Sequence, residues 1–140
     1  MDTIETRRIA KSVRAKCVRF ALSDKSRDYD FHGMSNLSCM CLFASTVLAA
    51  TLRRKVDPEA MIAVGQFTSG HDGRNHCWVV SQGKVIDITA TQFGMQQIEI
   101  HDAVTNTFWT EAERITPGDI PEDWPWTQSP TKSLLAKFVA

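Results

Sequence analysis

Apolar and polar positions follow two different periods along this chain, first that of a helix and later that of strands. Between residues 4 and 21, apolar side chains recur near helical spacing with arginines and lysines between them, which predicts an amphipathic helix of about twenty residues. Residues 23–36 have no period and many turn-forming side chains, so they predict a loop. From Cys39 to Ala50 the chain is apolar nearly all round, which is typical of a central, buried helix.

The limits of this second helix follow from its flanking residues. Ser38 is a good N-cap, and it would put Cys41 at the third helical position. The helix should then run to about Lys55, because Asp57 and Pro58 stop it. A cysteine is therefore expected in the first turn of a buried helix.

The period changes to that of β-strands after residue 60. Strands are predicted at Met61–Phe67, His76–Ser81 and Lys84–Thr89, with a loop at residues 68–74 and a turn at Gln82-Gly83. The predicted fold class is α+β, in which a central buried helix that carries Cys41 packs on a small antiparallel sheet that carries His76 and Asp87.

The pattern weakens beyond Gly94. A further strand is predicted at Gln97–His101, whereas residues 116–130 have no regular pattern. Within them, Trp124-Pro125-Trp126 is expected to pack as a lid or brace. Leu134–Val139 is expected to end the chain as a short helix or tail.

The turn at Gln82-Gly83 decides which side chains of the predicted hairpin meet. With a loop of two or four residues, Trp78 faces Asp87, and His76 and Asp87 become diagonal neighbours on one face of the sheet. A loop of three residues would shift the register by one and send Asp87 to the other face. The register is therefore a geometric test of any joint role for these two side chains.

Length and composition predict one domain that spans residues 1–140, since 140 residues with 43% apolar side chains can fill a single core. The longest apolar stretch, Cys39 to Ala50, is far shorter than the ~20 residues of a membrane span. The N-terminal segment also lacks the pattern of a secretory signal. We therefore expect a soluble, cytoplasmic protein with reduced cysteines and no membrane partner.

The charge distribution argues against a nucleic-acid partner. The formal net charge is zero, although residues 1–20 carry six basic and two acidic side chains. A nucleic-acid stripe would need interleaved aromatic side chains and a net basic domain. A solvated, basic helix face is the simpler interpretation.

Three residues stand in an order that suits nucleophilic catalysis: the thiol of Cys41, the imidazole of His76 and the carboxylate of Asp87. The thiolate is the nucleophile, and both the first turn of a helix and a neighbouring imidazolium lower the pKa of a thiol. His76 would act as the base, Asp87 would orient its ring, and the first-turn amides would form an oxyanion hole. Such chemistry needs no cofactor and no metal.

The remaining cysteines and histidines leave alternatives open. Cys39 and Cys41 differ by about 200° of helical rotation, so only one of them can face His76. Cys17 and Cys77 are expected to be core residues, with Cys77 pointing away from the site. The other histidines, His32, His71 and His101, are expected to be solvated, although His32 precedes the second helix and can approach the site.

A zinc-binding domain is a rival interpretation, with Cys39, Cys41, His76 and Cys77 as the four ligands. Adjacent residues on a strand point to opposite faces, and residues two apart on a helix also diverge. The spacing therefore disfavours a metal centre.

The sequence also resembles a known family in three segments. These are LSCMCLFAS at 37–45, NHCWVV at 75–80 and VIDITATQF at 85–93. Together they are similar to the transglutaminase-like branch of papain-fold cysteine enzymes, particularly its small bacterial and phage-associated members. The resemblance covers about residues 37–94 and assigns the nucleophile to Cys41, the base to His76 and the orienting acid to Asp87. Cys39 stands where the family prefers glycine.

This resemblance implies a thiol enzyme that acts on a peptide or protein amide through an acyl-enzyme intermediate. Family members include peptidases, deamidases, amide hydrolases and transglutaminases, and hydrolysis is favoured because a small domain has little surface for a second protein substrate. Two roles are open for Thr89 and Gln92, assistance in catalysis and hydrogen bonds that brace the loop after Asp87, and neither residue is placed in the catalytic set. The alternative is a catalytically inactive papain-like binding module, against which the presence of all three triad residues argues.

Overall fold

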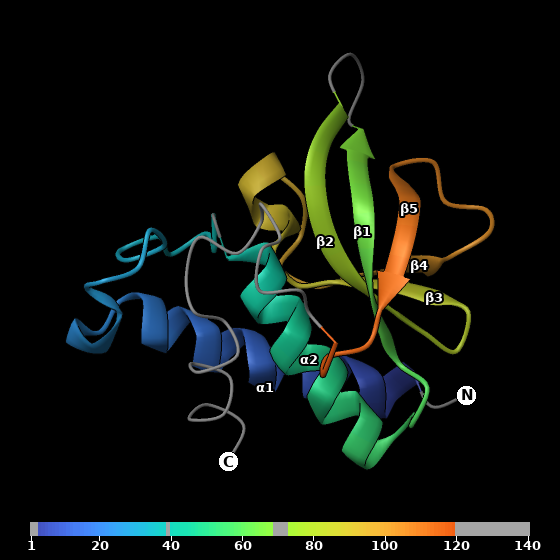
Figure 1. Ribbon diagram of the computed structural model, residues 1–140, viewed down its shortest axis with the longest axis horizontal. Coiled ribbons are helices and arrows are strands. Elements are labelled where there is room, and N and C mark those ends of the chain that lie inside the picture. The colour runs from blue at the N-terminus through green and yellow to red at the C-terminus, as the bar shows by residue number, and fades with distance from the viewer. Residues whose placement is uncertain (1–2, 39, 69–72, 120–140) are drawn as a thin grey trace.

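The structure is a computed structural model that describes residues 3–38, 40–68 and 73–119 (Figure 1). The helices are α1 (Thr3–Ala21), the 3-10 turn η1 (Asp24–Ser26), α2 (Cys41–Lys55) and the 3-10 turn η2 (Ala90–Phe93). The strands are β1 (Met61–Thr68), β2 (Gly73–Ser81), β3 (Lys84–Asp87), β4 (Glu99–Asp102) and β5 (Trp109–Ile115). The predicted α+β class is confirmed.

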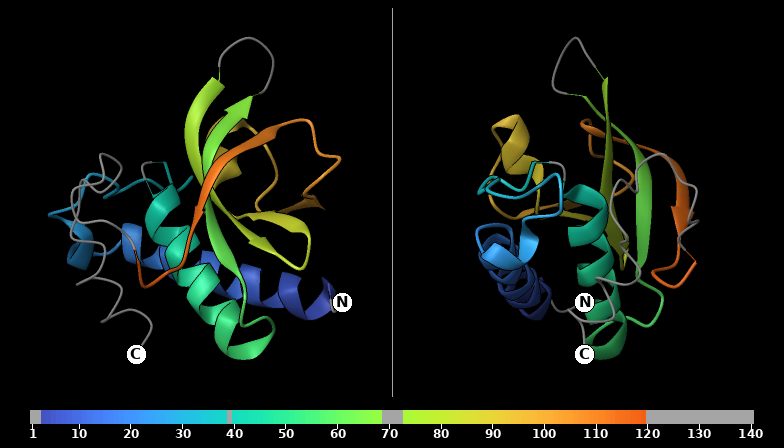
Figure 2. Two further views of the ribbon diagram at one scale, coloured as in Figure 1. Left: turned by 45° about the vertical axis from the view of Figure 1, so that its right-hand side comes forward. Right: turned by 60° about the vertical axis from the view of Figure 1, so that its left-hand side comes forward.

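The five strands form one antiparallel sheet in the order β4-β3-β2-β1-β5. Helix α2 packs against one face of this sheet, and α1 crosses on the outer side of α2 (Figures 1 and 2). The sheet curls so that its two edge strands approach each other, since the rings of His101 on β4 and Trp109 on β5 have centroids 4.8 Å apart. The curl encloses the face that α2 does not cover.

Two apolar clusters therefore lie on opposite faces of the sheet. The first lies between α1, α2 and the sheet and includes Leu48, Ile62 and Val79. The second lies inside the curl and includes Phe67, Trp78, Val80, Val85 and Trp109. Alternate residues of β2 contribute to the two clusters, as the two-residue period of a strand requires.

The hairpin between β2 and β3 has the predicted two-residue turn. Ser81 pairs with Lys84, and both Gln82 and Gly83 have positive φ, at 53° and 74°. Two successive left-handed residues form the turn whose twist matches that of a hairpin. The register that places His76 and Asp87 on one face is thus the one observed.

The start of α2 differs from the prediction. The helix begins at Cys41 after Met40, so Cys41 is its first residue and Ser38 is not its N-cap. The chain turns before the helix instead, because Leu37 is left-handed with φ 61° and the Met40 amide donates to the Leu37 carbonyl. The predicted end at Lys55 is confirmed.

Strand β5 was not predicted, and the limits of the four predicted strands shift by one to three residues. Of the seven residues of β5 only Trp109 is buried, so the strand shows no alternating pattern. It pairs with β1 across a bulge at Val64/Gly65, where a Cβ on Gly65 would lie 2.0 Å from the Thr110 carbonyl oxygen. Glycine at 65 is what lets β5 approach.

The expected lid at residues 124–126 and the expected element at 134–139 lie outside the described residues. Within the described part of the chain, no helix has the length and apolar character that crossing a bilayer demands.

Candidate active site

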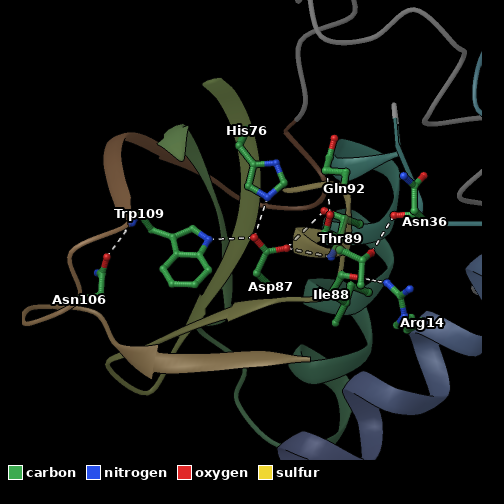
Figure 3. Close-up of polar contacts among 10 residues, drawn as sticks. Arg14, Asn36, His76, Asp87, Ile88, Thr89, Gln92, Asn106 and Trp109 are labelled. Carbon is green, nitrogen blue, oxygen red and sulfur yellow. Dashed lines mark hydrogen bonds and ion pairs between the residues drawn. The ribbon is translucent and has the colours of Figure 1, made fainter. Parts of the chain in front are cut away.

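His76 and Asp87 form a hydrogen-bonded pair inside the curled sheet. The Nε2 atom of His76, on β2, lies 2.6 Å from Oδ2 of Asp87, at the end of β3 (Figure 3). Both side chains are 1% exposed. The pair that the hairpin register predicted is therefore formed, and it is shielded from water.

The Asp87 carboxylate receives further hydrogen bonds that fix its orientation. Its Oδ1 accepts from the backbone N–H of Thr89 at 2.9 Å and from the Thr89 hydroxyl at 3.3 Å. Gln92 in turn donates from Nε2 to the Thr89 carbonyl at 3.0 Å. Of the two roles open for Thr89 and Gln92, these contacts agree with the bracing one (Figure 3).

Trp109 is a site residue that the sequence did not reveal. Its indole Nε1–H donates to Oδ2 of Asp87 at 2.8 Å, so this oxygen contacts both the imidazole and the indole. Trp109 reaches Asp87 because the curl brings β5 over the enclosed face (Figure 3). A tryptophan at the start of an otherwise exposed strand gave no signal of this contact.

Aromatic rings surround the His76 imidazole. The ring of Phe93 meets it edge-on with centroids 4.9 Å apart, and Phe67 meets it edge-on at 6.1 Å. Trp78 lies beside it at 6.0 Å. This enclosure lowers the local dielectric constant, which strengthens the interaction between His76 and any charge nearby.

Cys41 lies where the two faces of the sheet meet. Both His76 and Cys77 are close enough to the Cys41 thiol to lower its pKa. Because His76 and Cys77 point to opposite faces of β2, a thiol that is close to both lies near the edge of the strand. This edge is free because β3 ends at Asp87, short of the position opposite His76.

The second ring nitrogen of His76, Nδ1, is buried and has no hydrogen-bond partner among the described residues. The Cys41 thiol is close enough to raise the pKa of His76, so it is the candidate partner of this nitrogen, while Asp87 holds Nε2. Such a ring is oriented to exchange a proton with the sulfur.

The pKa values of all three groups are shifted in the direction that favours an ion pair. Hydrogen bonding from the Cys77 thiol lowers the pKa of Cys41, burial raises it, and His76 lowers it through a hydrogen bond and its charge, with a net value well below 9.0. Burial would lower the pKa of His76, but the charge and hydrogen bond of Asp87, with Cys41, raise it to about 10. Burial would also raise the pKa of Asp87, yet His76 and Trp109 hold it below 3.8.

The other described cysteines differ from Cys41. Burial in the first apolar cluster raises the pKa of Cys17 to about 12, as expected of a core thiol. Cys77 is a buried core residue on the face of β2 opposite His76, as expected, and the nearby Cys41 together with burial raises its pKa. Cys17, Cys41 and Cys77 are all free thiols. Cys39 lies outside the described residues, so its competition with Cys41 stays untested.

His32 and His101 have hydrogen-bond partners outside the triad. His32 is exposed and bonds to the Ser26 hydroxyl at 2.7 Å, while His101 bonds to Glu99 at 2.6 Å. His71 lies outside the described residues. Within the ranges that the structure describes, no three His, Cys, Asp or Glu side chains group as metal ligands.

The chain matches no protein-family model, no curated protein and no solved structure. The interpretation of the site therefore depends on its geometry and chemistry.

Proposed function

We propose that the protein is a thiol-dependent hydrolase or acyltransferase that acts on the amide carbonyl of a peptide bond or a glutamine side chain. Cys41 is the nucleophile, His76 the general base and acid, and Asp87 the residue that orients His76. The observation that carries the proposal is the buried, hydrogen-bonded pair of His76 and Asp87 beside the Cys41 thiol, with complementary pKa shifts of the three groups. Perturbed pKa values of this kind are typical of functional sites.

The first turn of α2 supports the same chemistry. No side chain caps the helix at Met40, and the first amides of a helix have no partner within it. These N–H groups lie beside the Cys41 sulfur in the chain and carry the positive end of the helix dipole. In the proposed reaction they stabilise the oxygen of the substrate carbonyl as it becomes negative.

The reaction proceeds in two halves. The Cys41 thiolate attacks the carbonyl carbon, His76 gives its proton to the departing amine as the C–N bond breaks, and a thioester forms. Water, or an acceptor amine, then loses a proton to His76 and attacks the thioester, which releases the acyl product and restores the thiolate. Asp87 stabilises the imidazolium without taking its proton.

The proposed fold relationship is to the transglutaminase-like, papain-fold cysteine enzymes. It is supported by the arrangement that this family would require, with the cysteine at the first residue of a buried helix and the His-Asp pair on adjacent antiparallel strands. The thioester chemistry requires a reduced thiol, which fits a cytoplasmic enzyme.

Thiol labelling tests the proposed nucleophile. At about pH 6 an ordinary thiol is well under 1% thiolate and reacts slowly with iodoacetamide, whereas Cys41 should be labelled about 100-fold faster than glutathione. Cys41→Ala should abolish the fast labelling, and His76→Ala should reduce it to the ordinary rate. Cys17→Ala is the matched control, because it removes a thiol from the apolar face and should leave the fast rate unchanged.

A second measurement tests the acyl transfer itself. A glutamine-containing peptide is incubated with hydroxylamine as the acceptor, and products are identified by mass spectrometry with the native chain and with Cys41→Ser. Hydrolysis, deamidation or a hydroxamate that depends on Cys41 supports the proposal. Fast labelling without any Cys41-dependent product over a broad panel of peptides would instead favour the inactive binding module.

A further inference from the structure

A second site lies outside the triad, along the exposed side of α1. An open pocket of about 990 Å³ has α1 as one wall and Ser35 with the segment Gln96–Ile98 as the other. Its lining includes none of Cys41, His76 and Asp87. The sequence suggested only a solvated helix face here, whereas the structure gives this face an opposing wall. We call this pocket the α1 pocket.

The described lining of the α1 pocket carries charge of one sign. Four cations line it, Arg7, Lys11, Arg14 and Arg19, and no Asp or Glu among the described residues does. Arg7, Lys11 and Arg19 are exposed, and none of them has an ion pair within the described ranges. Since the net charge of the chain is zero, this local excess of positive charge is not a property of the whole surface.

An acidic residue, Glu99, directly follows the lining segment Gln96–Ile98 in the sequence, and its carboxylate already has two hydrogen-bond partners. Its Oε1 contacts His101 at 2.6 Å and its Oε2 accepts from the Gln96 backbone N–H at 2.8 Å. Glu99 therefore has two partners, His101 and the backbone of Gln96, and is not itself among the lining residues of the α1 pocket.

Arg14 gives the α1 pocket a fixed cation. Its side chain is buried, 7% exposed, and donates from Nη1 to the Ile88 carbonyl, next to Asp87 in the chain. A guanidinium has five N–H donors, so one such bond leaves donors for a ligand. The remaining lining is neutral and includes the apolar Val18 and Ile98 and the amides of Gln96 and Gln97.

The dimensions of the cationic wall suit an extended chain. From Arg7 to Arg19, α1 rises about 18 Å at 1.5 Å per residue, the length of about five or six residues of extended polypeptide. The lining contributed by the described residues has no aromatic side chain, so it offers no base stacking of the kind that single-stranded nucleic acids use. Glutamine amides and small apolar side chains suit a peptide backbone instead.

We propose that the α1 pocket binds an acidic polypeptide segment of about five or six residues, rich in Asp or Glu. The carboxylates pair with Arg7, Lys11 and Arg19 along the helix, and Arg14 holds one of them at the base of the pocket. This inference concerns binding alone and does not depend on the reaction proposed for Cys41.

Fluorescence anisotropy with a dye-labelled hexaglutamate peptide tests the site at low ionic strength. The triple variant Arg7→Gln/Lys11→Gln/Arg19→Gln should bind about tenfold more weakly or worse, because each exposed pair contributes modestly. The matched variant Lys25→Gln/Arg54→Gln/Lys55→Gln removes three exposed cations outside the lining. It should bind within about twofold of the native chain.

Hexaglutamine and a single-stranded oligothymidine of the same length complete the experiment, with iodoacetamide labelling of Cys41 as a check on folding. The inference is supported if hexaglutamate binds saturably and more tightly than either hexaglutamine or the oligothymidine. This binding should be lost in the Arg7, Lys11 and Arg19 triple variant and kept in the control triple variant. Equal losses in the two triple variants, no saturable binding, or binding of the oligonucleotide at least as tight as that of hexaglutamate would overturn it. Because labelling reports on Cys41, failure here leaves the proposed function standing.

Discussion

The two faces of the sheet bury different kinds of side chain. The face under α2 is packed with aliphatic residues such as Leu48, Ile62 and Val79, and its thiol at Cys17 has a pKa of about 12. The enclosed face holds His76 and Asp87 among aromatic rings. Burial raises the pKa of one thiol, while hydrogen bonds and a cation lower that of Cys41 at the junction of the faces.

This difference shows that burial alone does not decide the state of a thiol. Cys17 has apolar surroundings and stays protonated, whereas Cys41 gains a partner from each face because the β2 edge is free beside it. The apolar face supplies the stability of the fold. The enclosed face contributes charge, whose burial is tolerated only because every ionised group has a partner.

The largest expected effect comes from removing the charge of Asp87. Asp87→Asn leaves the buried His76 without its carboxylate, so we expect the free energy of unfolding in urea to fall by about 3–5 kcal/mol. Glu111→Gln is the matched control, since the Arg114–Glu111 pair has a similar separation of 2.7 Å but side chains that are 46% and 33% exposed. That pair should contribute less than about 1 kcal/mol. Equal losses in the two variants would contradict the contrast between the enclosed face and the surface.

The second expected effect is a pH dependence specific to Cys41. Its pKa is lowered from 9.0, so its thiolate contributes stability that is full above pH 9.0 and is lost as the pH falls toward the folded value. For His76 the pKa is raised from 6.5 to about 10, so its contribution is full below pH 6.5 and is lost through about pH 10. Over the window from 6.5 to 9.0 the two opposite trends offset each other in the native chain.

Cys41→Ala removes one of these trends and leaves the other. The free energy of unfolding of the native chain minus that of the variant should rise with pH from 6.5 to 9.0, by up to about 1.4 kcal/mol per unit. Urea titrations at several pH values measure this difference in the free energy of unfolding. The contributions of the other titrating groups are common to both chains and cancel in it. Cys17→Ala should give a flat difference over this window, because the raised pKa of Cys17 keeps it protonated. A flat difference for Cys41→Ala as well would mean that Cys41 has an ordinary pKa.

The sequence predicted the His-Asp pair because local chemistry determines it. A two-residue turn at Gln82-Gly83 fixes the hairpin register, and the register puts both side chains on one face. The start of α2 was missed by contrast, because the left-handed Leu37 creates a turn that uses the residues expected to cap the helix.

The contacts of Trp109 and Cys77 could not be predicted, because both depend on tertiary structure. Trp109 meets Asp87 only after the sheet curls, and the exposed side chains of β5 hide the strand itself. Cys77 is close enough to Cys41 for each thiol to shift the pKa of the other, at the edge of β2 that is free because β3 stops at Asp87. The two-residue period of β2 predicted the correct face of the sheet for Cys77. It did not predict that the Cys77 sulfur lies near the free edge of β2.

The smallest expected effect sharpens the comparison within the enclosed face. Trp109→Phe keeps an aromatic ring against Phe67, whose centroid is 5.3 Å away, and removes the N–H that Asp87 Oδ2 accepts. A hydrogen bond to a charged group contributes about 1.5–3 kcal/mol, so we expect a loss near the lower end. The pKa of Asp87 should also rise, because the indole helps to hold it down. As the pH is lowered, the fast labelling of Cys41 should therefore be lost at a higher pH in this variant than in the native chain.

Trp78→Phe is the matched control for this last prediction. Trp78 is buried on the same face, but its indole Nε1 has no hydrogen-bond partner within the described residues. The substitution therefore removes an unsatisfied donor together with some packing, and it leaves the Asp87 carboxylate untouched. Labelling of Cys41 as a function of pH should keep its acid limit in Trp78→Phe and shift it upward in Trp109→Phe. If both variants shift it equally, the two indoles act by filling the enclosed face, and Trp109 does not position Asp87 through its N–H.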